Sequence, residues 1–364
     1  MIRWLALTGA LLVTLAACGP PPARPLPERA PDPPRAPFVP IEFPRDEAPH
    51  DKLTEWWYYT GHLFDADGTR YGFEFVIFQA VRGTLPVGYV AHMAVTDPAR
   101  GRFWHSERST IGSQIGRQDA IALDVAGWQL QGALGHDHIY ATGEEYGLDL
   151  RLTASKPPVL HAGIGWFSYG PVGDSYYYSR TRLAVEGTLF IGTEARPVQG
   201  QAWMDHQWGD FLVLGGWDWF SIQLDDDTEL MLTYTRLPDG RPGFAFGTQV
   251  ATDGTAIDLA MDSVTVEPLG SWTSPHTGAT YPSGWRVAVP SRQLVLELQP
   301  TMQDQELQSL SSTGIAYWEG QVEITGRRAD APIAGLGYVE LVGYATARPS
   351  TATSTTPPYS AQQP

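Results

Sequence analysis

Alternating apolar and polar residues run through most of the chain, and this pattern predicts strands. Tyr71, Phe73, Phe75 and Ile77 occupy every second position of one segment. Because successive side chains of a strand point to opposite faces, a period of two is typical of a sheet. Further runs include Leu183 with Val185 and Leu189, and the ranges 146–152, 219–224, 229–234, 285–289, 294–298, 321–325 and 337–344. Helical periodicity is weak, and only 304–310 predicts a short helix.

Short turns separate these segments. Asp67-Gly68, Asp239-Gly240 and Asp253-Gly254 are pairs that favour tight hairpins. Many antiparallel strands joined by short turns indicate an all-β fold of barrels or sandwiches, because closing a sheet removes its exposed edges. The sequence therefore predicts packed antiparallel β-barrel domains.

The β-rich part is long enough for two domains, since roughly 300 residues exceed what one barrel comfortably uses. A strand series ends at Asp210, Gly215-Gly216 follows, and a new series begins at Trp217. We therefore expect domains at 50–212 and 213–348. With no Gly/Pro linker between them, the two barrels should pack face to face, and their shared crevice is a natural position for a ligand.

The first residues predict export and a lipid anchor. Arg3 precedes an apolar run at 4–15 that falls short of the ~20 residues needed to span a bilayer, so a signal peptide at 1–18 is expected. Leu15-Ala16-Ala17-Cys18 resembles the bacterial lipoprotein box, whose cysteine is acylated, and Cys18 is the single cysteine of the chain. The glycine that follows it, Gly19, favours sorting of the lipoprotein to the outer membrane. The alternative is a plain secretory signal with an incidental cysteine.

Both ends of the mature chain are predicted to lack a core. Prolines recur through 19–49, which favours an extended polyproline tether to the membrane. The range 349–364 is rich in Ser, Thr and Pro and is predicted to be disordered. Apolar residues make up 43% of the 364 residues, which is enough to form a hydrophobic core that needs no disulfide. The net charge of −16 argues against nucleic acid as a partner.

Two polar-aromatic segments mark the candidate site. Residues 55–63 and 204–211 combine Trp and Tyr with His and carboxylates. Aromatic walls with a few polar groups are what a pocket for a large apolar molecule requires. The candidate ligand-binding residues are Trp56, Trp57, Tyr58, His92, Tyr177, Trp217 and Trp219. The alternative is ordinary packing, in which aromatics fill the core and Glu55, His62 and His92 are hydrogen-bonded polar residues.

Five motifs together resemble the AttH/carotenoid 1,2-hydratase family. They are EWWYYTGHL at 55–63, SYYYSRTRL at 175–183, GQAWMDHQWG at 200–209, AYWEG at 316–320 and GLGYVELVGY at 335–344. The resemblance, which runs from about residue 51 to 344, implies two lipocalin-like β-barrel domains. Members of that family include hydratases that add water to a terminal carotenoid double bond, fungal pericyclases of related fold, and proteins labelled secreted hydrolases associated with ABC transporters. With its lipoprotein signal, this chain is similar to the last group.

Hydration of an alkene needs a proton donor, a pocket that tolerates a carbocation, and a positioned water. A carboxylic acid in apolar surroundings can donate the proton, and aromatic faces can stabilise the cation. The family's His-x-Trp pair is carried by resemblance onto His206, as base or water-positioning group, and Trp208, as cation wall. We hypothesise Asp218 as the donor, within about 10 Å of His206 so that one water can lie between them. On a strand, Asp218 would face away from both Trp217 and Trp219, which weakens its desolvation.

Other polar residues have competing interpretations. Asp205 is a further catalytic candidate, with a turn or backbone-capping role as the alternative. His206 could instead be a buried residue that hydrogen-bonds across the domain seam. Arg180 and Arg182, on a Tyr-rich strand, favour pairing with acids inside the barrel over binding substrate.

Motifs of other enzyme classes are absent from the sequence. It contains no Gly-x-Ser-x-Gly elbow, His-Glu-x-x-His motif, cysteine zinc site, P-loop or dinucleotide glycine pattern, so we expect no metal and no cofactor. Asp205, His206 and Asp210 form only a weak metal pattern.

Two functions therefore stay open. One is an envelope enzyme that hydrates or isomerises an isoprenoid or lipid-like substrate. The other is a non-catalytic carrier of an apolar ligand, or an accessory protein of an ABC transporter that contacts its permease.

Overall fold

The computed structural model describes residues 38–115, 119–169, 173–211, 215–237, 239–309 and 312–345. The chain divides into two compact units, Met1–Val39 and Pro40–Pro364, and the fold below belongs to the second. The predicted signal peptide, Cys18 and the tail at 349–364 lie outside the described residues. Within the described ranges, no helix is both long and apolar enough to cross a membrane.

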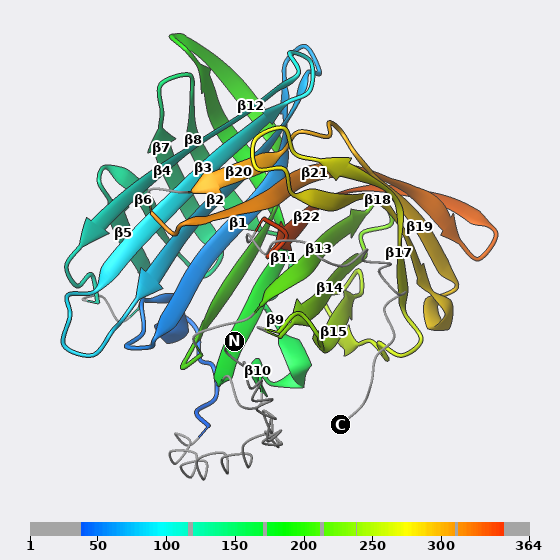
Figure 1. The fold of residues 1–364 in the computed structure, drawn as a ribbon, viewed down its shortest axis with the longest axis horizontal. Helices are drawn as coiled ribbons and strands as arrows, with labels where there is room; N and C mark the ends of the chain where they lie inside the picture. Colours follow the sequence, from blue (N-terminus) through cyan, green and yellow to red (C-terminus); the bar gives the residue numbers. More distant parts are fainter. Residues whose placement is uncertain are drawn as a thin grey trace, which may run out of the picture. The chain divides into compact units, whose positions relative to one another are not determined.

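The first sheet is a nearly closed antiparallel barrel (Figure 1). Its main path runs β4, β3, β2, β1, β12, β11, β8, β7, β6, β5. The edge strand β5 is joined by Asp124 to Gln114, beyond the end of β4, through bonds of 2.7 and 2.8 Å. The bounds of this sheet are β1 Thr54–Asp65, β2 Arg70–Ala80, β3 Gly88–Asp97, β4 Arg102–Ile111, β5 Ile121–Val125, β6 Trp128–Ala133, β7 His136–Thr142, β8 Tyr146–Ala154, β9 Val159–Leu160, β10 Trp166–Ser168, β11 Asp174–Ile191 and β12 Glu194–Gly209.

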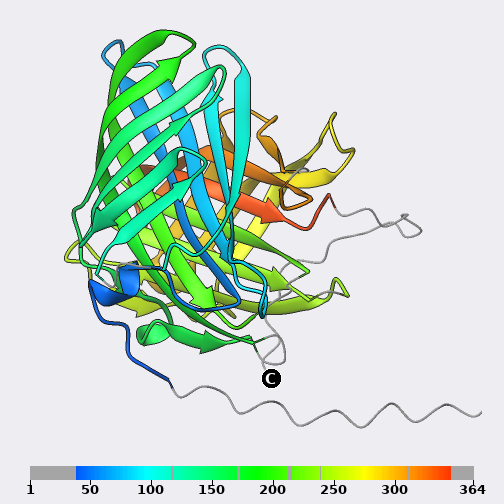
Figure 2. The same cartoon turned by 90° about the vertical axis from the view of Figure 1, so that its left-hand side faces the viewer.

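The second sheet is a half-barrel in the order β16, β15, β14, β13, β22, β21, β19, β18, β17, with β20 paired to β21. Figure 2, turned by 90°, shows its yellow-to-red strands beside the long strands of the first sheet. The bounds are β13 Gly216–Leu224, β14 Glu229–Arg236, β15 Pro242–Val250, β16 Ala256–Asp258, β17 Thr265–Thr273, β18 Thr280–Val289, β19 Leu294–Pro300, β20 Glu306–Ser309, β21 Ile315–Arg328 and β22 Ala331–Val342. Short 3-10 turns occur at η1 Arg45–Glu47, η2 His161–Gly163 and η4 Pro290–Arg292.

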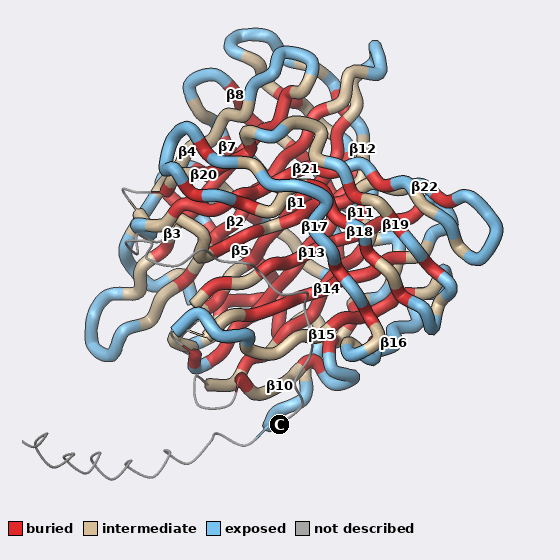
Figure 3. The backbone as a smooth tube through the Cα atoms, turned by 45° about the vertical axis from the view of Figure 1, so that its right-hand side comes forward, coloured by how far each residue is buried: buried red, intermediate tan, exposed pale blue. Residues whose placement is uncertain are grey.

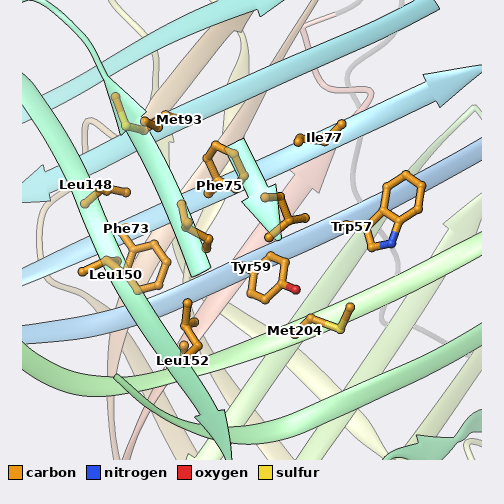
Figure 4. Close-up of a cluster of buried hydrophobic side chains, with 14 of the residues drawn as sticks. Trp57, Tyr59, Phe73, Phe75, Ile77, Met93, Leu148, Leu150, Leu152 and Met204 are labelled. Atoms are coloured by element: carbon orange, nitrogen blue, oxygen red, sulfur yellow. The ribbon is translucent and has the colours of Figure 1, made fainter. Parts of the chain in front are cut away.

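Alternation along β1 and β2 fills the first barrel. Trp57, Tyr59, Phe73 and Phe75 are fully buried and belong to one apolar cluster inside it (Figure 4). The intervening Val76 is also fully buried, but it packs in a separate cluster with Trp219 and Tyr338 of the second sheet. Strands covered on both faces are buried at nearly every position, as the red segments of Figure 3 show.

The two sheets are joined by polar contacts as well as apolar ones. Tyr58 donates to Glu319 at 2.8 Å, and Thr96 donates to Gln305 at 2.9 Å. His62 lies 3.0 Å from the Gly337 carbonyl. Buried polar groups are normally paired, so these bonds between the two halves of the fold fix how the sheets meet. His62 is therefore one of the hydrogen-bonded polar residues, and its partner belongs to the second sheet.

The predicted strands and hairpins are confirmed. All nine apolar–polar runs overlap strands, and the glycines of the three Asp-Gly pairs have φ angles of +79°, +84° and +85°. The helix predicted at 304–310 is wrong. Residues 306–309 form β20, which pairs with β21 and buries Glu306 and Leu307. Pairing with a neighbouring strand outweighs the weak local preference of this polar segment.

The predicted tether ends earlier than expected. Glu47 is 1% exposed and forms a buried ion pair with Arg180, and the Trp57 indole donates to the Glu47 carbonyl at 3.1 Å. The residues from Pro40 to Pro49 thus belong to the folded unit, although their proline content is typical of an extended chain. Arg182 also pairs with an acid, Glu229, but this acid belongs to β14 of the second sheet, so the pair lies between the sheets and not inside the barrel as predicted.

The sheet changes between β12, which ends at Gly209, and β13, which begins at Gly216. The division at 212/213 falls in this interval. Both sheets lie in the single compact unit Pro40–Pro364, so the two-domain division stays a prediction.

Candidate functional site

A cavity of about 580 Å³ lies between the two sheets. Several lining residues come from positions two residues apart, because alternate side chains of a strand share one face. The pairs are Trp56 and Tyr58 of β1, Asp205 and Gln207 of β12, and Trp217 and Trp219 of β13, with Tyr177 of β11 and Glu340 of β22 also in the lining. Both halves of the polar-aromatic pattern therefore contribute to one cavity.

Aromatic side chains form a large part of the cavity wall. Trp219 meets the Tyr58 ring edge-on at 5.2 Å, and Trp56 meets Phe211 edge-on at 5.6 Å. Phe246 lies 6.0 Å from Tyr177. Offset and edge-to-face contacts of this kind are the favoured arrangements of aromatic rings. Such a wall suits an apolar ligand and presents ring faces to any positive charge that develops on it.

Asp205 lies in this wall, and three side chains donate hydrogen bonds to its carboxyl group. Its carboxyl group accepts hydrogen bonds from the Tyr177 and Ser179 hydroxyls and, at 2.6 Å, from the Trp203 indole. Burial raises the pKa of Asp205 to about 6, although these hydrogen bonds act in the opposite direction. Trp219 donates to the Tyr177 hydroxyl at 3.1 Å and so extends the network. A turn or backbone-capping role for Asp205 does not fit these contacts.

Glu340 is the second acid of the cavity. The Trp217 indole donates to its carboxyl group at 2.6 Å. Burial raises the pKa of Glu340 to about 7, and the charge of Asp205 adds to the increase, while the Trp217 hydrogen bond opposes it. Glu74 and Glu319, both fully buried nearby, also have pKa values well above the usual range because of burial and the nearby charge of Glu340. Glu340 can therefore be protonated near neutral pH, as a proton donor must be.

His206 and Trp208 face the other side of β12. His206 lies 2.8 Å from Glu55 and is stacked on Trp57 inside the first barrel. Trp208 is stacked on His50 with ring centroids 4.2 Å apart. Burial lowers the pKa of His206. Neither residue lines the cavity, because Asp205 and Gln207 occupy the alternate positions that do.

Asp218 belongs to the interior of the second sheet. Arg236 donates to it at 2.6 Å, and the Tyr344 hydroxyl lies 3.0 Å away. Trp217 and Trp219 point to the cavity on the opposite face of β13, as strand alternation requires. The predicted pairing of His206 with Asp218 across a shared cavity is therefore wrong, since each is bonded within a different sheet.

Five of the seven predicted ligand-binding residues line the cavity. Trp57 and His92 do not. Trp57 packs inside the first barrel, and His92 lies 2.8 Å from the Tyr317 hydroxyl and 3.3 Å from that of Ser312. Glu340 was missed. The alternation of Tyr338-Val339-Glu340 places it on the same strand face as Tyr338, which packs at the seam, but the alternation does not show which residue of the first sheet it faces.

These features define a class of protein: two antiparallel sheets, one nearly closed, around an aromatic cavity with protonatable acids. Residues 33–344 match the family model AttH-like, and the chain belongs to this family. The resemblance inferred from the five motifs is thus confirmed.

Solved structures have the same fold. An AttH protein from Nitrosomonas europaea is 33% identical with a TM-score of 0.76, covering 85% of this chain and 98% of its own. Kievitone hydratase from Nectria haematococca shares 17% identity with a TM-score of 0.67, covering 83% of this chain and 93% of its own. The dehydratase asqC of Emericella nidulans is 23% identical over 210 residues, which are 53% of this chain and 57% of that relative's length.

Proposed function

We propose that this protein binds an isoprenoid or other lipid-like molecule in the cavity and adds water to, or removes it from, a carbon–carbon double bond. The observation that carries the proposal is Glu340, an acid with a pKa raised to about 7 in an aromatic cavity. The alignment with a hydratase structure and a dehydratase sequence supports this class of chemistry.

The geometry supports a short reaction sequence. The Glu340 carboxyl group gives its proton to one alkene carbon, and the positive charge that forms on the other carbon lies against the faces of Tyr58 and Trp219. A water oxygen then bonds to that carbon, and the proton it loses returns to the Glu340 carboxylate. Dehydration follows the same steps in reverse. Isomerisation results when the cation loses a different proton.

The proposal is tested with the full-length protein and an acyclic isoprenoid that has a terminal trisubstituted double bond. We expect a product heavier by one water, detected by mass spectrometry. Glu340→Gln should lower the rate about 10²–10⁴-fold, which is the usual contribution of a general acid. Glu186→Gln, which changes an exposed acid on β11, serves as the control and should leave the rate unchanged. Equal rates in Glu340→Gln and wild type would refute the assignment of Glu340.

The rate should also depend on pH. Because the donor must be protonated, kcat/KM should fall as pH rises through about 7, the pKa of Glu340. The groups that face it are Asp205 of β12, Tyr58 of β1, Glu74 of β2, and Glu319 and Tyr317 of β21. The tyrosines stay neutral in this range because burial raises their pKa values further above 10. A rate that is constant from pH 6 to 9 would contradict the role of Glu340.

A second candidate is a carrier, which the many aromatic side chains in the cavity lining also favour. In this alternative the lipid anchor at Cys18 holds the protein at the periplasmic face of the outer membrane, and a transporter permease is its partner. The same incubation separates the two proposals. A carrier retains the isoprenoid unchanged, with equal affinity in wild type and Glu340→Gln.

A further inference from the structure

We propose that His50, Glu55 and His206 bind one divalent transition-metal ion of the Zn²⁺ type inside the first barrel. These three residues, called the His-Glu-His cluster below, each offer a ligand atom, and the three atoms lie within 4.8 Å of one another. The cluster is separate from the cavity, because none of its residues is in the cavity lining.

The three ligand atoms lie close together, with the Glu55 oxygen near both imidazoles. Glu55 Oε1 lies 2.7 Å from His50 Nδ1 and 2.8 Å from His206 Nε2. Ligands about 2.0–2.2 Å from a tetrahedral Zn²⁺ are roughly 3.3 Å apart. The two separations from Glu55 therefore have to widen by about half an ångström to admit the ion, which a carboxylate rotation can supply, while the two imidazole nitrogens lie within 4.8 Å of each other.

Each ligand is held by a further residue. His50 Nε2 lies 3.3 Å from Asp46, and His206 Nδ1 lies 3.3 Å from the Tyr178 hydroxyl. The second oxygen of Glu55 accepts hydrogen bonds from the His50 backbone at 2.8 Å and from the Gln79 amide at 3.0 Å. Metal-binding histidines usually have their other ring nitrogen bonded in this way, which fixes the tautomer and the ring orientation.

Ring stacking fixes the two imidazoles in place. Trp57 stacks on His206 at 4.7 Å, and Trp208 stacks on His50 with an interplanar angle of 3°. Glu55 and His206 are fully buried, whereas the His50 side chain is 19% exposed. An ion can therefore enter from the side of His50, and the packed aromatic rings restrict how far the ligands move.

The donor set indicates the type of ion. Two imidazoles and one carboxylate are a common set for Zn²⁺ sites that keep a fourth position open for water. Oxygen-rich sites, by contrast, suit Mg²⁺ and Ca²⁺. His50 reaches the cluster only because residues 46–50 pack against the barrel, so the sequence alone could not bring the three residues together.

The test uses the full-length protein, stripped with a chelator and dialysed, then titrated with Zn²⁺ by calorimetry and analysed for bound metal by mass spectrometry. We expect about one Zn²⁺ per chain. His50→Ala should weaken binding at least about 100-fold, and Asp46→Asn about 10–100-fold, as for other residues that orient a metal ligand. His276→Ala is the matched control, since it removes an exposed histidine that also pairs with an aspartate, and it should bind Zn²⁺ as wild type does.

Two outcomes would overturn the proposal. One is wild-type protein that binds no Zn²⁺, which would leave the cluster as a hydrogen-bonded Glu–His network. The other is unchanged Zn²⁺ binding in His50→Ala, which would place the ion elsewhere in the chain. His206→Ala risks misfolding because its ring is fully buried, so the partly exposed His50 is the decisive variant.

Discussion

Glu229 of β14 joins the two sheets through a buried charge cluster. Its carboxylate is fully buried and lies 2.6 Å from Arg182 Nε of β11 and 2.8 Å from Lys156 Nζ in the loop after β8. Thr181 adds a weaker contact at 3.4 Å. We predict that Glu229→Gln destabilises the fold, because Lys156 and Arg182 lose a buried counter-charge while glutamine keeps nearly the same shape, and Arg182 keeps only the exposed Asp227 at 3.6 Å.

The expected loss is about 3 kcal/mol of unfolding free energy. Removing one partner of a buried ion pair costs about 3–5 kcal/mol. The lower end applies here, because Lys156 also bonds to the Ala251 carbonyl at 3.1 Å, Arg182 bonds to the Leu224 carbonyl at 2.9 Å, and the glutamine carbonyl still accepts one bond. With an m value of about 3 kcal/mol/M, the urea midpoint should fall by about 1 M.

Urea unfolding followed by both tryptophan fluorescence and far-UV circular dichroism measures this change. Coincident curves from the two methods show that unfolding is a two-state transition. Glu297→Gln is the matched control. This substitution breaks an exposed ion pair, because the side chains of Glu297 and Arg286 are 44% and 50% exposed. It should cost about 0–1 kcal/mol. A Glu229→Gln midpoint no lower than that of Glu297→Gln would refute the reasoning that this cluster stabilises the seam.

Two other substitutions test the structure. Gly72→Ala should cost about 1–3 kcal/mol, because a Cβ there would meet the Tyr338 hydroxyl at 2.5 Å and Gln321 Cβ at 3.0 Å across the seam. Gly88→Ala, with no atom within 4 Å, is its control, and equal melting temperatures for the two variants would contradict the close approach. Asp218→Asn should cost about 3 kcal/mol, because it removes the negative charge from the ion pair with Arg236, in which Asp218 is fully buried. A melting temperature equal to that of wild type would show that this ion pair does not stabilise the second sheet.

The local sequence pattern predicted most of the fold, because strand alternation and Asp-Gly turns depend only on residues that are close together in the chain. The strands at 71–78 and 183–189 and the turn at Asp67-Gly68 needed no distant information. The errors occurred where distant contacts decide. β20 is a strand because it pairs with β21. Residues 40–49 pack against the fold through contacts such as the ion pair of Glu47 with Arg180, which lies 133 positions away.

The candidate site was predicted in the same uneven way. Trp56 with Tyr58, and Trp217 with Trp219, could be identified because each pair follows the two-residue period of a single strand. The assignment of the catalytic acid failed because it required knowing which strand of the second sheet faces β12. Glu340 meets Asp205 only through the packing of the two sheets, and no spacing along the chain records that contact.

The adjacent residues Asp205 and His206 show how one strand can serve two separate sites. The pleat sends Asp205 to the cavity, with Tyr177 and Trp203 around it, and sends His206 to Glu55 in the first barrel. A motif containing both residues invites the inference that they act together, whereas strand geometry requires the opposite. Each residue of the motif at 200–209 should therefore first be assigned to one face of β12 by whether its number is odd or even, and only then given a chemical role.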